Sequence, residues 1–235
     1  MNFLKQMEDF DLYMHALVKQ HFEEHDKEIV ELYSLLECLT NFNTIYPNIE
    51  SNIIMDEVKT DLFSSIYLST KGMYRNAFIS LRSSLELGIG YLYFLDNNLD
   101  YIKWTKNKFD LSWSRLNDEN YGVLRVDYLK LFYETENLDE AYKVLIDKCK
   151  YNYRTCSEYT HGKYGYMKTN LSTRYEYNEY DYKKFIDSYK EVVSCLIILQ
   201  VIRFNKSLNN LNSEYLEDVE VILKSEGLKE ILVYE

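Results

Sequence analysis

The chain has 235 residues, of which only 7 are glycine and 1 is proline. A β-sandwich or barrel needs a turn about every 8–12 residues, and turns depend on glycine, proline, asparagine and aspartate. Hydrophobic residues make up 46% and charged residues 28%, which excludes collagen-like and disordered chains. The net charge of −11 argues against a nonspecific nucleic-acid-binding protein. We therefore expect an all-α protein.

Apolar residues recur at three- and four-residue steps along the first half of the chain, which is the spacing of one helix face. The pattern predicts these helices: one long or two consecutive helices over 3–42, then 52–70 and 73–96, and short helices near 101–107 and 125–135. Tyr46-Pro47-Asn48 and Lys71-Gly72 are the two predicted breaks, because proline and glycine interrupt helices.

In the second half, Asn137 and Glu140 resemble a capping box that starts a helix running to about Tyr159. Gly162 suits the stop of that helix, and together with Gly165 it predicts a loop over 162–178. The remaining predicted elements are a long helix over 179–206, a short helix over 213–225, and a strand or docking segment over 231–234.

No internal repeat or linker divides the chain, so we expect a single helical bundle. Its parts are an N-terminal helix or helical pair (1–46), the bundle (47–207), and a C-terminal tail packed on it (208–235). The apolar run 192–202 is shorter than the roughly 20 residues that cross a bilayer, so it predicts a core helix and no membrane association.

The cysteines indicate a reducing compartment. No two of them form a CxxC pair; they are Cys38, Cys149, Cys156 and Cys195. The opening residues carry charge and lack the apolar run of a signal peptide. We expect a cytoplasmic protein with buried free thiols.

Positive charge is concentrated in two stretches of this acidic chain. Residues 141–175 hold seven basic groups against two acids, and residues 101–115 hold four against one. The rest of the chain therefore carries −19. A basic island on an acidic body can mark an anion site, or it can be a solvated face.

The residues most suited to chemistry are Arg154 and His161. They stand seven residues apart, which is nearly two helical turns, so both side chains should lie on one side near the end of a helix. The helix dipole there favours a protonated histidine. Arginine offers a planar cation that suits phosphate, and histidine moves protons near neutral pH. Upstream, Arg82 and Glu86 are four apart and are expected to pair within an apolar helix.

The Arg-x6-His pair resembles the Arg-x4–6-His signature of HEPN domains, small all-helical domains of prokaryotic toxins and defence systems. The sequence from Ser157 to Gly162 is similar to the end of that signature in abortive-infection members. The segment from Gly72 to Glu86 is similar to the second core helix of the same members. Thr155 departs from the pattern, because active members often carry Asn, Asp or His directly after the arginine.

The resemblance implies a metal-independent endoribonuclease without a cofactor, acting at a homodimer cleft and restrained by an antitoxin or another defence-system protein. It implies that His161 is the general acid or base and that Arg154 stabilises the phosphorane, giving a 2′,3′-cyclic phosphate. The supporting residues would be Arg82, Glu86 and Ser157. The RNA-binding residues would be Lys150, Lys163, Tyr164, Tyr166 and Lys168. Related domains also serve as non-catalytic interaction modules.

Three alternatives stay open. The Arg82, Glu86, Arg154 and His161 side chains can form a buried ion-pair network that fixes helix register. His21-Phe-Glu-Glu24-His25 matches an inverted zinc-protease motif, but its charged surroundings favour an exposed helix face without a metal. Cys149 and Cys156 lack the close spacing of a zinc site and are better explained as core thiols.

Overall fold

The fold is described from a computed structural model, in which the described residues are 3–45, 49–133, 137–161, 163 and 175–231. Within these ranges every regular element is an α-helix or a short 3-10 turn, which confirms the all-α prediction. The helices are α1 (Phe3–Glu24), α2 (Asp26–Asn41), α3 (Asn52–Thr70), α4 (Tyr74–Asp96), α5 (Asn98–Thr105), α6 (Trp113–Leu116), α7 (Val126–Lys130), α8 (Asp139–Thr160), α9 (Glu179–Phe204) and α10 (Ser213–Ser225).

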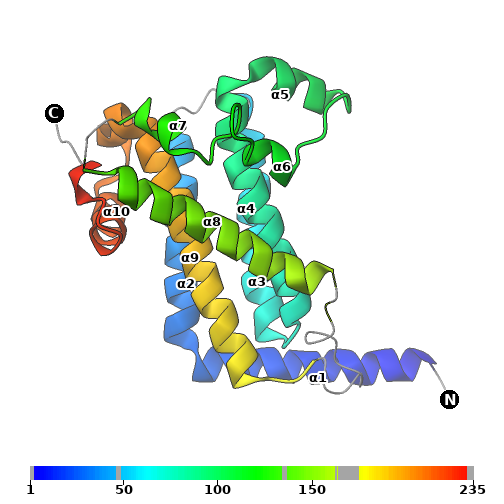
Figure 1. The fold of residues 1–235 in the computed structure, drawn as a ribbon. Helices are drawn as coiled ribbons and strands as arrows, with labels where there is room; N and C mark the ends of the chain where they lie inside the picture. The colour runs from blue at the N-terminus through cyan, green and yellow to red at the C-terminus, as the bar shows by residue number, and fades with distance from the viewer. Residues whose placement is uncertain (1–2, 46–48, 134–136, 162, 164–174, 232–235) are drawn as a thin grey trace.

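Residues 3–41 form two helices that meet at His25. The backbone of His25 departs from helical geometry (φ −130°, ψ 29°), although its N–H still donates to the His21 carbonyl at 2.9 Å. Figure 1 shows α1 lying across the end of the other helices, with its N-terminal half projecting beyond them. Phe3 and Met7 on that half are therefore exposed, whereas Leu17 on the same face is buried.

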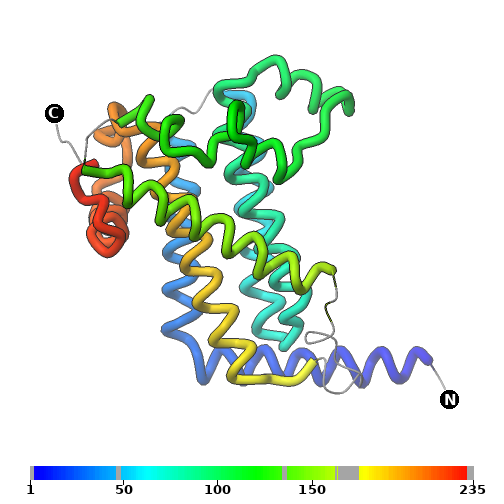
Figure 2. The backbone as a smooth tube through the Cα atoms, in the orientation of Figure 1, coloured from blue at the N-terminus to red at the C-terminus, as the bar shows by residue number. Residues whose placement is uncertain are grey.

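A tight turn at Gly72 joins α3 to α4, as predicted. Gly72 adopts a left-handed φ of +64°, and the N–H of Met73 donates to the Leu68 carbonyl at 3.0 Å. This is the Schellman ending of a helix, in which glycine is favoured. The break lets α3 and α4 run antiparallel and pack along their length (Figure 2).

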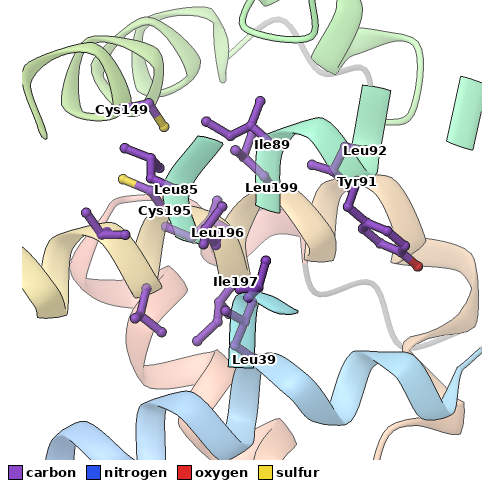
Figure 3. Close-up of a cluster of buried hydrophobic side chains, with 14 of the residues drawn as sticks. Leu39, Leu85, Ile89, Tyr91, Leu92, Cys149, Cys195, Leu196, Ile197 and Leu199 are labelled. Atoms are coloured by element: carbon purple, nitrogen blue, oxygen red, sulfur yellow. The ribbon is translucent and has the colours of Figure 1, made fainter. Parts of the chain in front are cut away.

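The centre of the core lies where α2, α4, α8 and α9 meet. Figure 3 shows side chains from these helices converging, among them Leu39, Leu85, Cys149 and Leu196. The apolar run 192–202 of α9 lies inside this cluster, because α9 is covered on several sides by other helices. The prediction that this run is a core helix is confirmed.

Two predictions about local structure are wrong, and one short helix was missed. Helix α6 was not expected, because four residues are too few to show helical periodicity. Helix α7 ends at Lys130, well short of the predicted 125–135. Helix α8 takes Leu138 as its N-cap and no side chain caps it. Asn137 is therefore not the capping residue, and Glu140 does not occupy the third position that a capping box requires.

Other predictions fall outside the described residues: the turn at Tyr46-Pro47-Asn48, the stop at Gly162, Gly165, and the end of segment 231–234. Ile231 itself is buried and closes a 3-10 turn. Within the predicted loop over 162–178, the structure describes Lys163 and 175–178. There the Asn178 side chain caps α9 by accepting from the Asp181 N–H at 2.9 Å.

Candidate active site

Arg154 and His161 lie at the C-terminal end of α8, as their spacing predicts. Helix α8 ends at Thr160, and His161 extends its last turn, because its backbone N–H donates to the Ser157 carbonyl at 2.9 Å. The Arg154 side chain is 80% exposed, and His161 is exposed as well. Both functional groups are therefore accessible to a ligand at one end of one helix.

Glu158 lies between the cations of this helix end. Its Oε1 is 3.9 Å from Arg154 Nε and 2.6 Å from Lys163 Nζ. The Lys163 backbone N–H also donates to the Glu158 carbonyl, at 3.3 Å. An ion pair as long and exposed as that of Arg154 contributes little free energy, so Arg154 can exchange Glu158 for an anionic ligand.

Arg82 and Glu86 lie between α4 and α8, behind the exposed helix end. Arg82 Nη2 donates to Tyr153 Oη at 2.6 Å and lies 3.9 Å from Glu86 Oε2. The Trp113 ring stacks on Tyr153, with centroids 3.8 Å apart. A single buried ion-pair network that includes Arg154 is therefore wrong, because Arg154 is exposed. Arg82 instead positions Tyr153, the residue before Arg154.

Two residues of α4 that the sequence analysis did not single out hold the end of α8. Arg75 donates from Nε to the Tyr159 carbonyl at 3.1 Å and from Nη2 to the Thr160 carbonyl at 3.4 Å. These are carbonyls that a helix end leaves unpaired. The Phe78 ring stacks on Tyr159 at 3.9 Å. Arg75 lies within the segment that carries the HEPN resemblance, but no side-chain pattern reveals a partner that is a backbone carbonyl.

The two polar residues between Arg154 and Glu158 do not project from the exposed face. Ser157 Oγ donates to the Tyr153 carbonyl at 2.7 Å, so it supports the helix backbone. Thr155 is buried. The residue that departs from the pattern of active HEPN members therefore faces the core and not the surface that Arg154 occupies.

Two of the predicted RNA-binding residues are described. Lys163 is exposed beside Glu158. Lys150 is half-buried on α8, one turn before Arg154, and forms no ion pair within the described ranges. The other three lie outside the described residues; they are Tyr164, Tyr166 and Lys168.

All four cysteines are buried free thiols, as predicted. Burial raises the pKa of Cys156 to about 12. A hydrogen bond with Cys149, together with burial, raises the pKa of Cys195 well above its ordinary value. Thiols that stay protonated are weak nucleophiles and weak metal ligands. In the part of the chain that the structure describes, no three His, Cys, Asp or Glu side chains gather as metal ligands.

The His21-x-x-Glu24-His25 motif lies at the elbow between α1 and α2, and the expectation of an exposed helix face is wrong for His21. The His21 side chain is buried, with ring centroids 4.7 Å from Tyr177 and 5.0 Å from Tyr182. Its centroid is 5.3 Å from that of His25. Burial lowers the pKa of His21, and repulsion from His25 adds to the effect.

We expect acid to destabilise the fold through His21. Because its pKa is lowered from 6.5 in the folded state, the unfolded chain binds the proton more tightly. Well above pH 6.5 the imidazole is neutral in both states and does not affect the free energy of unfolding. As the pH falls from 6.5 toward the folded-state pKa, the free energy of unfolding decreases by at most about 1.4 kcal/mol per pH unit. The non-titrating variant His21→Phe should flatten this dependence in urea unfolding measured across that range.

The matched control is His15→Phe, since His15 is exposed on the same helix. This variant should leave the pH dependence of unfolding as in the wild type. A His21→Phe curve that runs parallel to the wild-type curve would contradict the assignment.

Comparison with protein-family models, with curated proteins and with solved structures gives no match to this chain. Within the described residues, no helix is both long and apolar enough to cross a membrane. The C-terminal end of α8 is therefore the feature of the molecule that bears on function. There Arg154 and Lys163 are exposed on either side of Glu158, and His161 is exposed just beyond it. Arg82, which lies 3.9 Å from Glu86, donates to Tyr153 Oη, and Ser157 donates to the Tyr153 carbonyl.

Proposed function

We propose that the chain is a metal-independent endoribonuclease of the HEPN type, acting in the cytoplasm as part of a prokaryotic toxin–antitoxin or phage-defence system. The observation that carries the proposal is the joint exposure of Arg154 and His161 at the end of α8. A histidine that can transfer protons and an arginine that can stabilise a phosphorane are the groups that RNA cleavage by its own 2′-hydroxyl needs. The two motif segments around Gly72–Glu86 and 157–162 support the same assignment.

In the proposed reaction, the ribose 2′-oxygen attacks the adjacent phosphorus and the bond to the 5′-oxygen breaks. One imidazole takes the proton from the 2′-hydroxyl, and another protonates the departing 5′-oxygen. A homodimer with both His161 side chains at one cleft would supply the two. Arg154 stabilises the additional negative charge on the phosphorane. The products are a 2′,3′-cyclic phosphate and a 5′-hydroxyl.

The test is cleavage of RNA by the purified protein in the presence of EDTA. We expect His161→Ala to lower the rate by about 10²–10⁴, the usual contribution of a general acid or base. The wild type should leave cyclic-phosphate ends. His15→Ala removes an exposed histidine of α1 and should cleave as fast as the wild type.

Cleavage that is equal in wild type and His161→Ala, or that disappears with EDTA, would contradict the proposal. Arrest of bacterial growth by wild type but not by His161→Ala is the cellular counterpart of the same comparison.

The second candidate function is a non-catalytic, HEPN-like module for dimerisation or partner binding. The observation that favours it is the environment of Arg154, whose following residue, Thr155, is buried and whose carboxylate neighbour Glu158 also pairs with Lys163. Intact RNA in the presence of the wild-type protein and its partner would favour this function.

A further inference from the structure

The arm between α5 and α6 carries exposed cations that form no close ion pair. We define the α5–α6 arm as residues 103–115. Many lysines elsewhere form ion pairs, among them Lys19, Lys59, Lys130, Lys143, Lys148, Lys183, Lys190 and Lys224. In the arm, Lys103 pairs with Asp100, whereas Lys106, Lys108 and Arg115 are exposed and form no ion pair with any described residue. Hydrogen bonds lower the pKa of the Asp100 and Asp118 carboxyls, and Arg115 is still near enough to both to lower it further. With Asp110 as its single acid against four basic residues, the arm is a net positive segment on a chain of net charge −11.

The backbone fixes where these charges lie. Helix α5 ends in a Schellman turn, in which Asn107 adopts a left-handed φ of 53°. The Lys108 N–H donates to the Lys103 carbonyl at 2.8 Å, and the Asn107 N–H donates to the Trp104 carbonyl at 3.0 Å. Lys106 and Lys108 thus flank a closed turn, and their backbone needs no ordering when an anion binds.

The arm also packs firmly on α4. The Arg115 guanidinium lies 5.5 Å from the Phe109 ring centroid, and that ring contacts Tyr93. Gly90 lies so close under Leu111 that a Cβ there would collide with the leucine side chain. Arg115 and the backbone of the arm are therefore held in a defined position on α4.

A stacked pair of rings joins the arm to the helix that carries the candidate active site. Trp113 of the arm stacks on Tyr153 of α8, with the ring planes only 4° apart. Arg154 follows Tyr153 directly, and Figure 1 shows the arm and the C-terminal end of α8 on the same side of the molecule. Within the arm itself, the half-buried rings of Trp104 and Trp113 stand among the cations in the sequence, so partly exposed aromatic surface accompanies the positive charge.

We infer that the α5–α6 arm binds the phosphate backbone of single-stranded RNA whose next nucleotides pass along α8 toward Arg154 and His161. The inference rests on the proposed function, since it extends the same substrate beyond the reacting helix end. Cations interspersed with partly exposed rings suit a single strand, because phosphates pair with the cations while unpaired bases stack on rings such as Trp104 and Trp113. An acidic protein surface would use the charge but not the rings.

The test measures binding of a fluorescently labelled single-stranded RNA of mixed sequence to the full chain carrying His161→Ala, so that RNA stays intact. The arm variant adds Lys106→Glu, Lys108→Glu and Arg115→Glu. The control variant adds Lys27→Glu, Lys206→Glu and Lys229→Glu, which make the same charge change at exposed lysines on other elements. Urea unfolding of each protein establishes that it is folded.

We expect the arm variant to bind RNA at least about tenfold more weakly than its parent, and the control variant less than about twofold more weakly. The slope of log affinity against log salt should fall by about 2 in the arm variant, because each lost phosphate contact removes roughly 0.7. Equal weakening by both variants, or no RNA binding by the parent, would overturn the inference. Displacement of RNA by polyglutamate at matched charge would overturn it in favour of an acidic protein partner.

Failure of this inference and failure of the proposed function give different results. If the wild type cleaves RNA and the three arm substitutions, made with His161 intact, change neither cleavage nor binding, the inference is wrong and the function stands. If RNA binding depends on the arm while the wild type leaves RNA intact, the arm is a binding surface and the cleavage proposal fails.

Discussion

Replacement of Phe78 by alanine should lower the free energy of unfolding by about 3–5 kcal/mol, the usual cost of emptying a buried aromatic site. Phe78 is fully buried on α4, stacks on Tyr159 of α8 at 3.9 Å, and meets Phe185 of α9 edge-on at 5.7 Å. It therefore joins three helices at the level of the candidate active site. Urea unfolding followed by circular dichroism measures the loss.

Two further variants make this prediction specific. Phe78→Leu keeps most of the volume and should cost less than about 1.5 kcal/mol. Phe63→Ala removes the same side chain from an exposed position on α3 and should change stability by less than about 0.5 kcal/mol. Similar losses for Phe78→Ala and Phe63→Ala would contradict the packing described here.

Gly72→Ala is expected to destabilise the fold by about 2–4 kcal/mol, for two reasons that add. The left-handed φ of +64° strains any residue with a Cβ, and that Cβ would lie 2.6 Å from the Glu176 carbonyl oxygen. Glu176 belongs to the segment before α9, in which the Asn178 N–H donates to Tyr74 Oη at 3.2 Å. The added Cβ therefore collides with the Glu176 backbone, which cannot move away freely because Asn178 is hydrogen-bonded to Tyr74.

Gly227 provides the matched control. It has a similar φ of +71°, but a Cβ there would meet nothing within 4 Å. Gly227→Ala should cost only the backbone term of about 1–2 kcal/mol. The difference between the two variants measures the contact with Glu176, and equal losses would exclude that contact as a cause.

The helices that could be predicted from the sequence are those defined by apolar spacing and by breaks within their own segments. The predicted bounds of α3, α4 and α10 agree with the observed bounds to within one residue, because a glycine or a polar break stands at the ends of these helices. Helix α6 could not be found this way, since four residues do not complete a recognisable pattern. The false capping box at Asn137 shows that residue types alone do not place a helix start to the residue.

In the candidate active site, too, some features could be predicted from the sequence and others could not. The placement of Arg154 and His161 near the end of one helix follows from their spacing and could be predicted, whereas their exposure could not, because spacing does not decide between a surface pair and a buried ion-pair network. The contacts of Arg75 with carbonyls of α8 could not, because they join residues 84 and 85 positions apart. The burial of His21 likewise depends on Tyr177 and Tyr182, which are far from it in the sequence. Such contacts exist only once the helices have packed.

The four buried thiols can report how often the core opens locally. They are distributed over three helices: α2 holds Cys38, α8 holds Cys149 and Cys156, and α9 holds Cys195. Because only an accessible thiolate reacts, a thiol reagent modifies each cysteine at the rate at which its own surroundings open. The labelling rate of each cysteine in the native protein can be measured by mass spectrometry. These rates order the three helices by how readily they open locally, and no cysteine has to be introduced by mutation. Cys156 reports on the turn just before His161, where fraying of α8 would separate the two groups proposed to act together.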